Sequence, residues 1–139
     1  MTARTPAQNY NDSLMERDHS RQLMLFNDLK AAIRGGAPES LVYGILEQLV
    51  EHTNLHFLSE QLAMKLYAYE AFESHLLEHQ RLLAEVKNLK SALSAGTPSE
   101  KQGLIEALRG WMIAHIETTD RALAEYLNTR TAAPLNPST

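Results

Sequence analysis

Residue types that bind metals recur at a spacing of four in this chain of 139 residues. His75 and His79 form one such pair, and His56 and Glu60 form another. On an α-helix, residues four apart project from the same face, one turn from each other. The spacing therefore predicts two helices that each present two potential ligands on one side.

Turn signals divide the first half of the chain into two long helices. Gly35-Gly36 followed by Pro38 indicates the end of one helix and the start of the next, because glycine favours a helix end and proline a first turn. We place these helices at about residues 11–34 and 39–67.

The second half contains two further helices and no strands. No glycine or proline marks the start of the third helix, which we place near residues 69–72, and Ala95-Gly96 ends it. Thr97-Pro98-Ser99-Glu100 is a capping box with proline at the first helical position, and it begins the fourth helix. Four long helices joined by short loops predict an all-α fold, an up-down-up-down four-helix bundle. We expect the bundle to cover residues 1–128 and a flexible tail to cover 129–139.

Apolar residues at helical spacing predict the face of each helix that packs inward. In chain order, these predicted core residues are Leu23, Phe26, Leu29, Ile33, Leu41, Ile45, Leu49, Leu55 (or His56), Leu62, Leu82, Leu83, Val86, Leu89, Leu104, Leu108, Trp111 and Leu123.

Composition restricts the classes of partner. With 22% charged residues and a net charge of -4, the chain lacks the clustered basic residues that nucleic acids and anionic membranes require. It has no long apolar run and no signal peptide, so we expect no membrane span and a cytoplasmic location. The absence of cysteine excludes disulfides, thiolate metal sites and thiol nucleophiles.

The remaining ligand candidates lie near the middles of the first and the fourth predicted helix. His19 belongs to the first helix and His115 to the fourth, and mid-helix residues of such a bundle meet at one level. Buried imidazoles and a buried glutamate are costly unless they pair or coordinate a cation. Iron, zinc and manganese all accept this combination of donors.

The motifs resemble those of the hemerythrin family over nearly the whole bundle. The family pattern is D/E-x-x-H, then H-F-x-x-E, H-x-x-x-H and W-x-x-x-H-x-x-x-x-D. Here it reads Glu16-Arg17-Asp18-His19, His56-Phe57-Leu58-Ser59-Glu60, His75-Leu76-Leu77-Glu78-His79, and Trp111-Met112-Ile113-Ala114-His115 with Asp120 five residues later.

The resemblance implies two iron ions bridged by an oxo or hydroxo group and by two carboxylates. The implied ligands are His75, His79 and His115 for one iron, His19 and His56 for the other, and Glu60 and Asp120 as bridges. The second iron would be one ligand short, and dioxygen would bind there. Only the resemblance supports Asp120, because five residues on an ideal helix rotate by about 140°. A local π-type bulge would reconcile this spacing with a shared face.

The resemblance also implies an oxygen pocket, which in this chain departs from the family's apolar pattern. We expect the pocket to be lined by Gln22, Phe57, Trp111, Met112 and Ile116, with His52 beside them. His52 could hydrogen-bond an oxygen species or ligate the second iron outright. Alternatively, His52 is partly exposed and Gln22 faces solvent.

The expected function is dioxygen binding for transport, storage or delivery, with an unknown protein partner. The alternatives are a redox protein that handles peroxide or nitric oxide, whose open iron position His52 modifies, and an oxygen or redox sensor. An enzyme is less expected than a binding protein. A ferritin-like site would need a second Glu-x-x-His beyond Glu16-x-x-His19, and no His-Glu-x-x-His of a zinc protease occurs.

Overall fold

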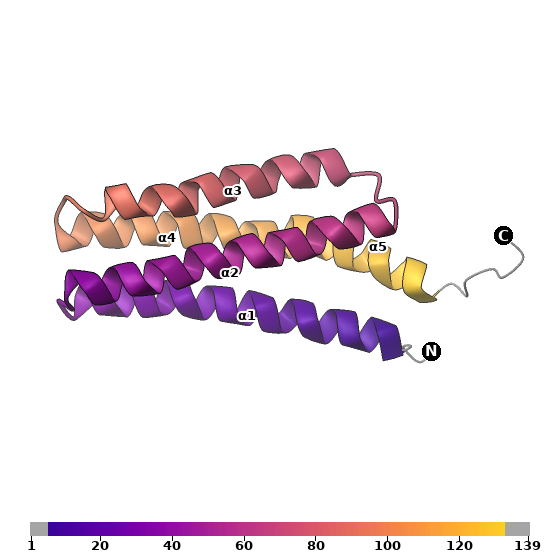
Figure 1. Cartoon of the computed structure of the whole chain (residues 1–139), viewed down its shortest axis with the longest axis horizontal. Helices are drawn as coiled ribbons and strands as arrows, with labels where there is room; N and C mark the ends of the chain where they lie inside the picture. Colours follow the sequence, from indigo (N-terminus) through magenta and orange to yellow (C-terminus); the bar gives the residue numbers. More distant parts are fainter. Residues whose placement is uncertain (1–5, 133–139) are drawn as a thin grey trace, which may run out of the picture.

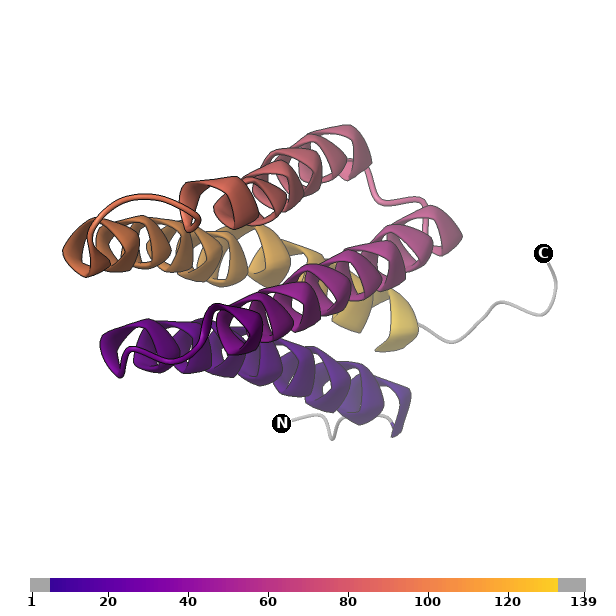
Figure 2. The same cartoon turned by 60° about the vertical axis from the view of Figure 1, so that its left-hand side comes forward.

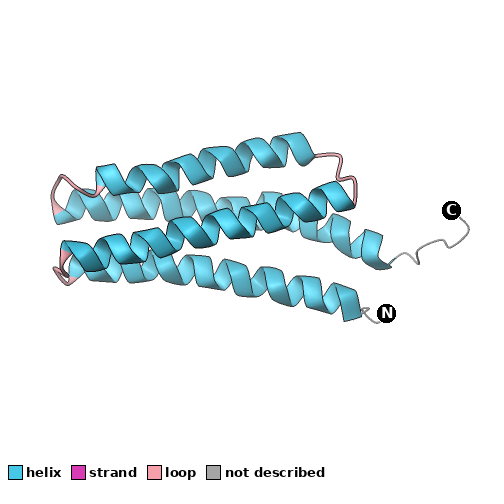
Figure 3. Cartoon of the chain, viewed as in Figure 1, coloured by secondary structure: helices cyan, strands magenta, loops and turns pink. Residues whose placement is uncertain are grey.

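Four long helices form an up-down-up-down bundle in the computed structural model, which describes the backbone of residues 6–132 and the side chains of residues 17–129 (Figure 1). No strand occurs among residues 6–132, as the helical colouring of Figure 3 shows. The fourth long helix contains a π-helical segment, η1. The elements are α1 (Pro6–Arg34), α2 (Glu39–Leu66), α3 (Phe72–Ala92), α4 (Pro98–His115), η1 (Ile116–Asp120) and α5 (Arg121–Ala132). The predicted fold class is confirmed.

The outer ends of the bundle differ from the predicted limits. Helix α1 begins at Pro6, five residues before the predicted start, because proline is compatible with the first helical position. Helix α5 continues to Ala132, and residues 133–139 of the predicted tail lie outside the described residues. The side chain of Glu16, in the first motif, also lies outside them.

Local signals account for two of the three turns. Gly36 adopts a φ of 66° after α1, and the amide of Ala37 donates to the carbonyl of Ala32 at 2.9 Å. This is the glycine-terminated helix end that the sequence predicted. The Thr97 hydroxyl accepts a hydrogen bond from the amide of Glu100 at 3.1 Å, which confirms the predicted cap of α4.

The turn between α2 and α3 depends on a tertiary contact instead. Ala68 adopts a left-handed φ of 53° without being glycine, which costs about 1–2 kcal/mol. The hydroxyl of Tyr126, from α5, donates to the carbonyls of Tyr67 and Ala68. A contact from the other end of the sequence therefore stabilises this turn.

Two apolar clusters lie on either side of the middle of the bundle. Figures 1 and 2 show the α1–α2 and α3–α4 turns at one end of the bundle and the α2–α3 turn at the other. The larger cluster reaches Ile33 and Leu93, next to the first two turns, and the smaller is made of residues near the α2–α3 turn and of α5. Phe26, Leu49, Val86 and Ile105 belong to the larger cluster, and Met64, Leu123 and Leu127 form the smaller one. The predicted ligands occupy the level between them.

Several predicted core leucines are wrong. Leu41, Leu55 and Leu62 of α2 are exposed, and so is Leu104 of α4. Helix α2 has two apolar stripes. The stripe that also carries the predicted ligands His56 and Glu60 faces the core. Within residues 6–132, none of the helices contains an apolar stretch of the length that a membrane span requires.

Candidate metal centre

All seven predicted ligands meet at one level of the bundle. They form two adjoining groups whose donor atoms lie within 4.8 Å of one another in each group. One group contains His75, His79, His115, Glu60 and Asp120, and the other contains His19, His56, Glu60 and Asp120. The two carboxylates belong to both groups.

Glu60 of α2 divides its oxygens between the groups. Its Oε1 lies 2.8 Å from Nε2 of His79 and 3.5 Å from Nε2 of His75. Its Oε2 lies 3.5 Å from Nε2 of His56. One carboxylate therefore presents one oxygen to each group.

Asp120 repeats this arrangement from the opposite side. Its Oδ1 lies 2.9 Å from Nε2 of His115 and 3.2 Å from Nε2 of His75. Its Oδ2 lies 2.9 Å from Nε2 of His19. Each of the two carboxylates therefore faces both groups of histidines.

The π-helical segment places Asp120 on the ligand face. The amide of Arg121 donates to the carbonyl of Ile116, five residues back, and the Thr118 hydroxyl donates to the carbonyl of Ala114 at 2.7 Å. A π-turn accommodates one more residue than an α-turn, so residues five apart can share a face. This is the bulge that the spacing of His115 and Asp120 required.

The burial of these side chains and the hydrogen-bond partners of their polar atoms indicate whether the site fits a metal ion. Six of the seven side chains are at most 4% exposed, and His19 is 15% exposed. Apart from the contact between His19 and Asp120, the short distances above do not have hydrogen-bond geometry. Nε2 of His56, His75, His79 and His115, both oxygens of Glu60 and Oδ1 of Asp120 therefore have no hydrogen-bond partner. Each orphaned buried polar group costs about 1–3 kcal/mol. Bound cations would satisfy these atoms together, so the donor set fits a metal centre.

The charges within the centre strongly shift the pKa values of two of its histidines and of Glu60. Burial lowers the pKa of His56, but the carboxylates of Glu60 and Asp18 outweigh burial and raise it to about 9. Burial also lowers the pKa of His75, and Asp120 with Glu60 raises it to about 9. Burial raises the pKa of the Glu60 carboxyl, while the neighbouring histidines lower it to about 2.

Polar side chains behind the histidines orient their rings. The Asp18 carboxylate accepts from Nδ1 of His56 at 2.9 Å, and the Glu78 carboxylate lies 3.3 Å from Nδ1 of His115. The proton on Nδ1 leaves Nε2 free for a metal. The carboxamide nitrogen of Gln61 lies 3.3 Å from Nδ1 of His79, and rotating the amide would present its oxygen there instead.

Sequence reasoning gave no role to these orienting residues. Asp18 and Glu78 lie inside the quoted motifs, next to His19 and His79, yet each contacts a histidine on another helix. These contacts could have been predicted only from knowledge of which helices pack against each other.

The layer next to the ligands is closed and partly polar. Gln22, Thr53, Leu82 and Met112 are all 0% exposed, and each is three residues from a histidine of the predicted ligand set. The Gln22 amide donates to the Thr53 hydroxyl at 3.1 Å, and its own oxygen has no partner. The alternative that Gln22 faces solvent is therefore wrong.

His52 lies outside both groups. It is partly exposed, and its Nε2 donates to the backbone carbonyl of Asp18 at 2.9 Å. Its ring is parallel to that of His56, at a centroid distance of 6.3 Å. This nitrogen is thus directed at the backbone of α1, and the structure does not bring His52 among the predicted ligands.

The other predicted pocket residues surround the centre at different depths. Phe57 is buried and stacks on His79 with a centroid distance of 3.8 Å, so it covers that ligand. Ile116 is half-buried against the larger apolar cluster.

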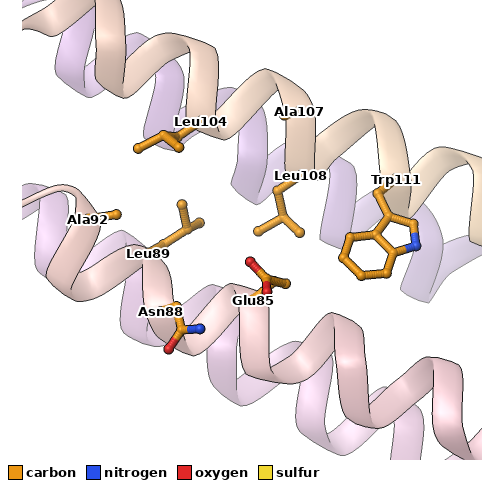
Figure 4. Close-up of a pocket in the computed structure, with 8 residues that line it drawn as sticks. All are labelled: Glu85, Asn88, Leu89, Ala92, Leu104, Ala107, Leu108 and Trp111. Carbon is orange, nitrogen blue, oxygen red and sulfur yellow. The ribbon is translucent and has the colours of Figure 1, made fainter.

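Trp111 is not part of the metal pocket. It is 37% exposed and lines a pocket of about 190 Å³ between α3 and α4, across from Glu85 (Figure 4). The inward positions of α4 include Leu108, Met112 and His115, so Trp111 lies at the flank that faces α3.

The fold and site together define a metal-binding four-helix bundle with two adjoining donor groups. A family model described as "Hemerythrin HHE cation binding domain" matches residues 11–127, and the chain therefore belongs to the hemerythrin family. Membership in this family implies non-haem iron as the metal.

Individual relatives agree with this assignment. The chain is 29% identical over 76 residues to a bacteriohemerythrin of Methylococcus capsulatus and 34% identical over 77 residues to myohemerythrin-1 of Phascolopsis gouldii. Each match covers 55% of this chain, and the matches cover 58% and 59% of those two proteins. A bacteriohemerythrin of Ralstonia nicotianae is 23% identical over 119 residues, which cover 86% of this chain and 83% of that protein. No solved structure matches the chain significantly.

Proposed function

We propose that this chain binds two iron ions, one in each donor group, and uses them to bind dioxygen for transport, storage or delivery. The observation that carries the proposal is the division of Glu60 and Asp120, each of which directs one oxygen to each group. Two carboxylates shared in this way suit a pair of metal ions better than a single one. The similarity to bacteriohemerythrins and to a myohemerythrin supports iron and dioxygen.

The two groups would have different tasks. His75, His79 and His115 would hold one iron, and His19 and His56 the other, with Glu60 and Asp120 as bridges. A pair of ferrous ions, one with an open coordination position, supplies the two electrons and the binding position that dioxygen requires. The group with one histidine fewer, His19 and His56, would leave this position open.

The side chains around the second group favour access by a small molecule. His19 is the most exposed of the predicted ligands, whereas the histidines of the first group are at most 1% exposed. Phe57, Leu82 and Met112 close the layers around the ligands and exclude bulk water. The centre is thus buried, and its side at His19 is less covered than the rest.

One observation favours a second candidate function, the handling of peroxide or nitric oxide. Gln22 and Thr53 place a polar pair one turn from His19 and His56, where an apolar lining would best protect a reversible oxygen carrier. The free end of the Gln22 amide could hydrogen-bond a polar ligand of the second iron. A redox reaction would tolerate this polarity better than storage would.

Oxygen uptake distinguishes these functions. The iron-loaded chain is reduced under nitrogen and titrated with dioxygen while its optical spectrum is recorded. A carrier takes up one dioxygen per iron pair, and lowering the oxygen pressure reverses the spectral change. Continued turnover of added peroxide or nitric oxide in the presence of a reductant supports the redox alternative. A reduced, iron-loaded chain that neither takes up dioxygen nor changes its spectrum would contradict the proposal.

A further inference from the structure

Helix α2 carries a stripe of exposed leucines that the metal centre does not explain. Leu55, Leu58, Leu62 and Leu66 are 59%, 52%, 70% and 72% exposed, and steps of three and four residues place them on one face. We call these four residues the α2 leucine stripe. Contiguous apolar surface of this kind is uncommon on a monomer and marks an interaction site.

The stripe faces away from the metal centre. Leu58 and Leu62 are each two residues from Glu60, which is about 200° of helical rotation. Helices α1 and α3 pack against α2 on its sides, yet they leave the four leucines exposed. In Figure 1, α2 runs along the outside of the bundle over its whole length. A partner on this face would leave the ligands undisturbed.

We propose that the stripe binds a second copy of this chain, with the two α2 helices antiparallel about a twofold axis near Leu58. Leu55 lies three residues before Leu58 and Leu62 four after it, so Leu55 of one copy packs against Leu62 of the other. Leu58 packs against its own equivalent at the axis. A twofold interface requires this kind of self-complementary surface.

The charges beside the stripe select this orientation. Glu51 and Lys65 are both exposed and lie seven residues from Leu58 in opposite directions. An antiparallel pair therefore places Glu51 of each copy opposite Lys65 of the other, at both ends of the interface. A parallel pair would place like charges opposite each other. Within one chain, the exposed Lys65 places its ammonium 5.6 Å from the centre of the Phe72 ring, a contact that is weak where the cation is in solvent.

The size of the stripe indicates how strong the association is. From Leu55 to Leu66 the helix advances by about 17 Å. An interface centred on one such segment is at the small end of specific protein interfaces. The dimer should therefore form reversibly and depend on concentration. This proposal does not depend on which ligand the iron binds.

Sedimentation of the iron-loaded chain at increasing concentration tests the proposal. The average mass should rise from the 15.6 kDa of the monomer towards twice that value. The double variant Leu58→Glu/Leu62→Glu should remain monomeric at the same concentrations, with unchanged iron content as the sign that its fold is intact. Leu104→Glu, which changes an exposed leucine on α4, is the matched control and should associate like the parent.

Charge reversal tests the orientation. Glu51→Lys and Lys65→Glu should each weaken association by about tenfold, because each creates two like-charge contacts per dimer. The double variant Glu51→Lys/Lys65→Glu restores opposite charges and should associate like the parent. A parent that stays monomeric up to millimolar concentration, or a dimer that survives Leu58→Glu/Leu62→Glu, would overturn the proposal. Failure of the double charge reversal to restore association would overturn the antiparallel arrangement.

Discussion

Nε2 of His115 lies 2.9 Å from Oδ1 of Asp120, although five residues separate the two along one continuous helix. An ideal α-helix would turn Asp120 about 140° away from His115, and the π-helical segment Ile116–Asp120 removes that difference. The helix thereby delivers a carboxylate that faces both donor groups.

Asp120→Asn should therefore weaken metal binding in both groups at once. The amide keeps the shape of the side chain but removes the charge and one of the two acceptor oxygens. We expect the iron affinity, measured by competition with a chelator, to fall strongly. The loss should exceed the roughly 10–100-fold that is typical when a residue hydrogen-bonded to a metal ligand is replaced. Glu117→Gln, in the same π-helical segment but exposed, should bind iron like the parent. Equal affinities for all three proteins would exclude Asp120 as a ligand.

Asp18 should contribute to metal affinity without touching the metal. Its carboxylate accepts a hydrogen bond from Nδ1 of His56 at 2.9 Å, which fixes the ring and increases its basicity. Asp18→Asn should lower the iron affinity by about 10–100-fold. Asp28→Asn, on an exposed position of the same helix, serves as the control. If both variants retain the affinity of the parent, the contact between Asp18 and His56 has no part in metal binding.

The fold could be predicted because most of its signals are local. Gly36 ends α1 and Thr97 caps α4 through contacts within a few residues, so the sequence around each was sufficient. The turn at Ala68 carries no such signal, because the hydroxyl of Tyr126 supports it from the other end of the sequence. Leu55 and Leu62 were placed in the core because periodicity alone cannot tell which of two apolar stripes turns inward.

That the candidate ligands meet could be predicted for a similar reason, whereas the residues that support them could not. His75 and His79 share a helix face, so their spacing is informative. Glu78 lies between them in sequence but contacts His115 on α4, and no spacing within α3 indicates that contact. His52 was expected near the second iron because it is one turn from a ligand, but its ring turns towards the carbonyl of Asp18.

The buried pair of Gln22 and Thr53 should cost the chain stability. Gln22→Leu removes an amide oxygen that has no partner, but it also leaves the Thr53 hydroxyl without the hydrogen bond from the amide, so the two effects should largely cancel, to within about 1 kcal/mol. Thr53→Val removes the amide's remaining partner and should destabilise the fold by about 1–3 kcal/mol. The double variant Gln22→Leu/Thr53→Val removes both partners and the unpaired oxygen, so it should be more stable than either single variant and at least as stable as the parent. Denaturant unfolding measures all three differences.

The same variants test whether the polarity serves a function. If Gln22→Leu/Thr53→Val is more stable and also prolongs the oxygenated state of the iron-loaded chain, the polar pair works against reversible oxygen storage. A Thr53→Val variant as stable as the parent would contradict the buried hydrogen bond on which this prediction rests.

Metal uptake should depend on pH because the ligand histidines must lose protons. The carboxylates around His56 and His75 raise the pKa of each to about 9, so both rings are charged at pH 7 in the metal-free chain. Binding should then release about two protons at pH 7, and the affinity should rise as the pH increases towards 9. Calorimetric titration with ferrous iron under nitrogen, in two buffers of different ionisation enthalpy, counts these protons. Uptake without proton release at pH 7 would contradict the raised pKa values.

The number and kind of metal ions per chain test the central claim most directly. Five histidines and two shared carboxylates offer more donors than one ion can use, and they divide into two groups. Elemental analysis of the chain, expressed in iron-replete medium and isolated in air, should find two iron ions per chain. One zinc ion per chain and no iron would contradict the account.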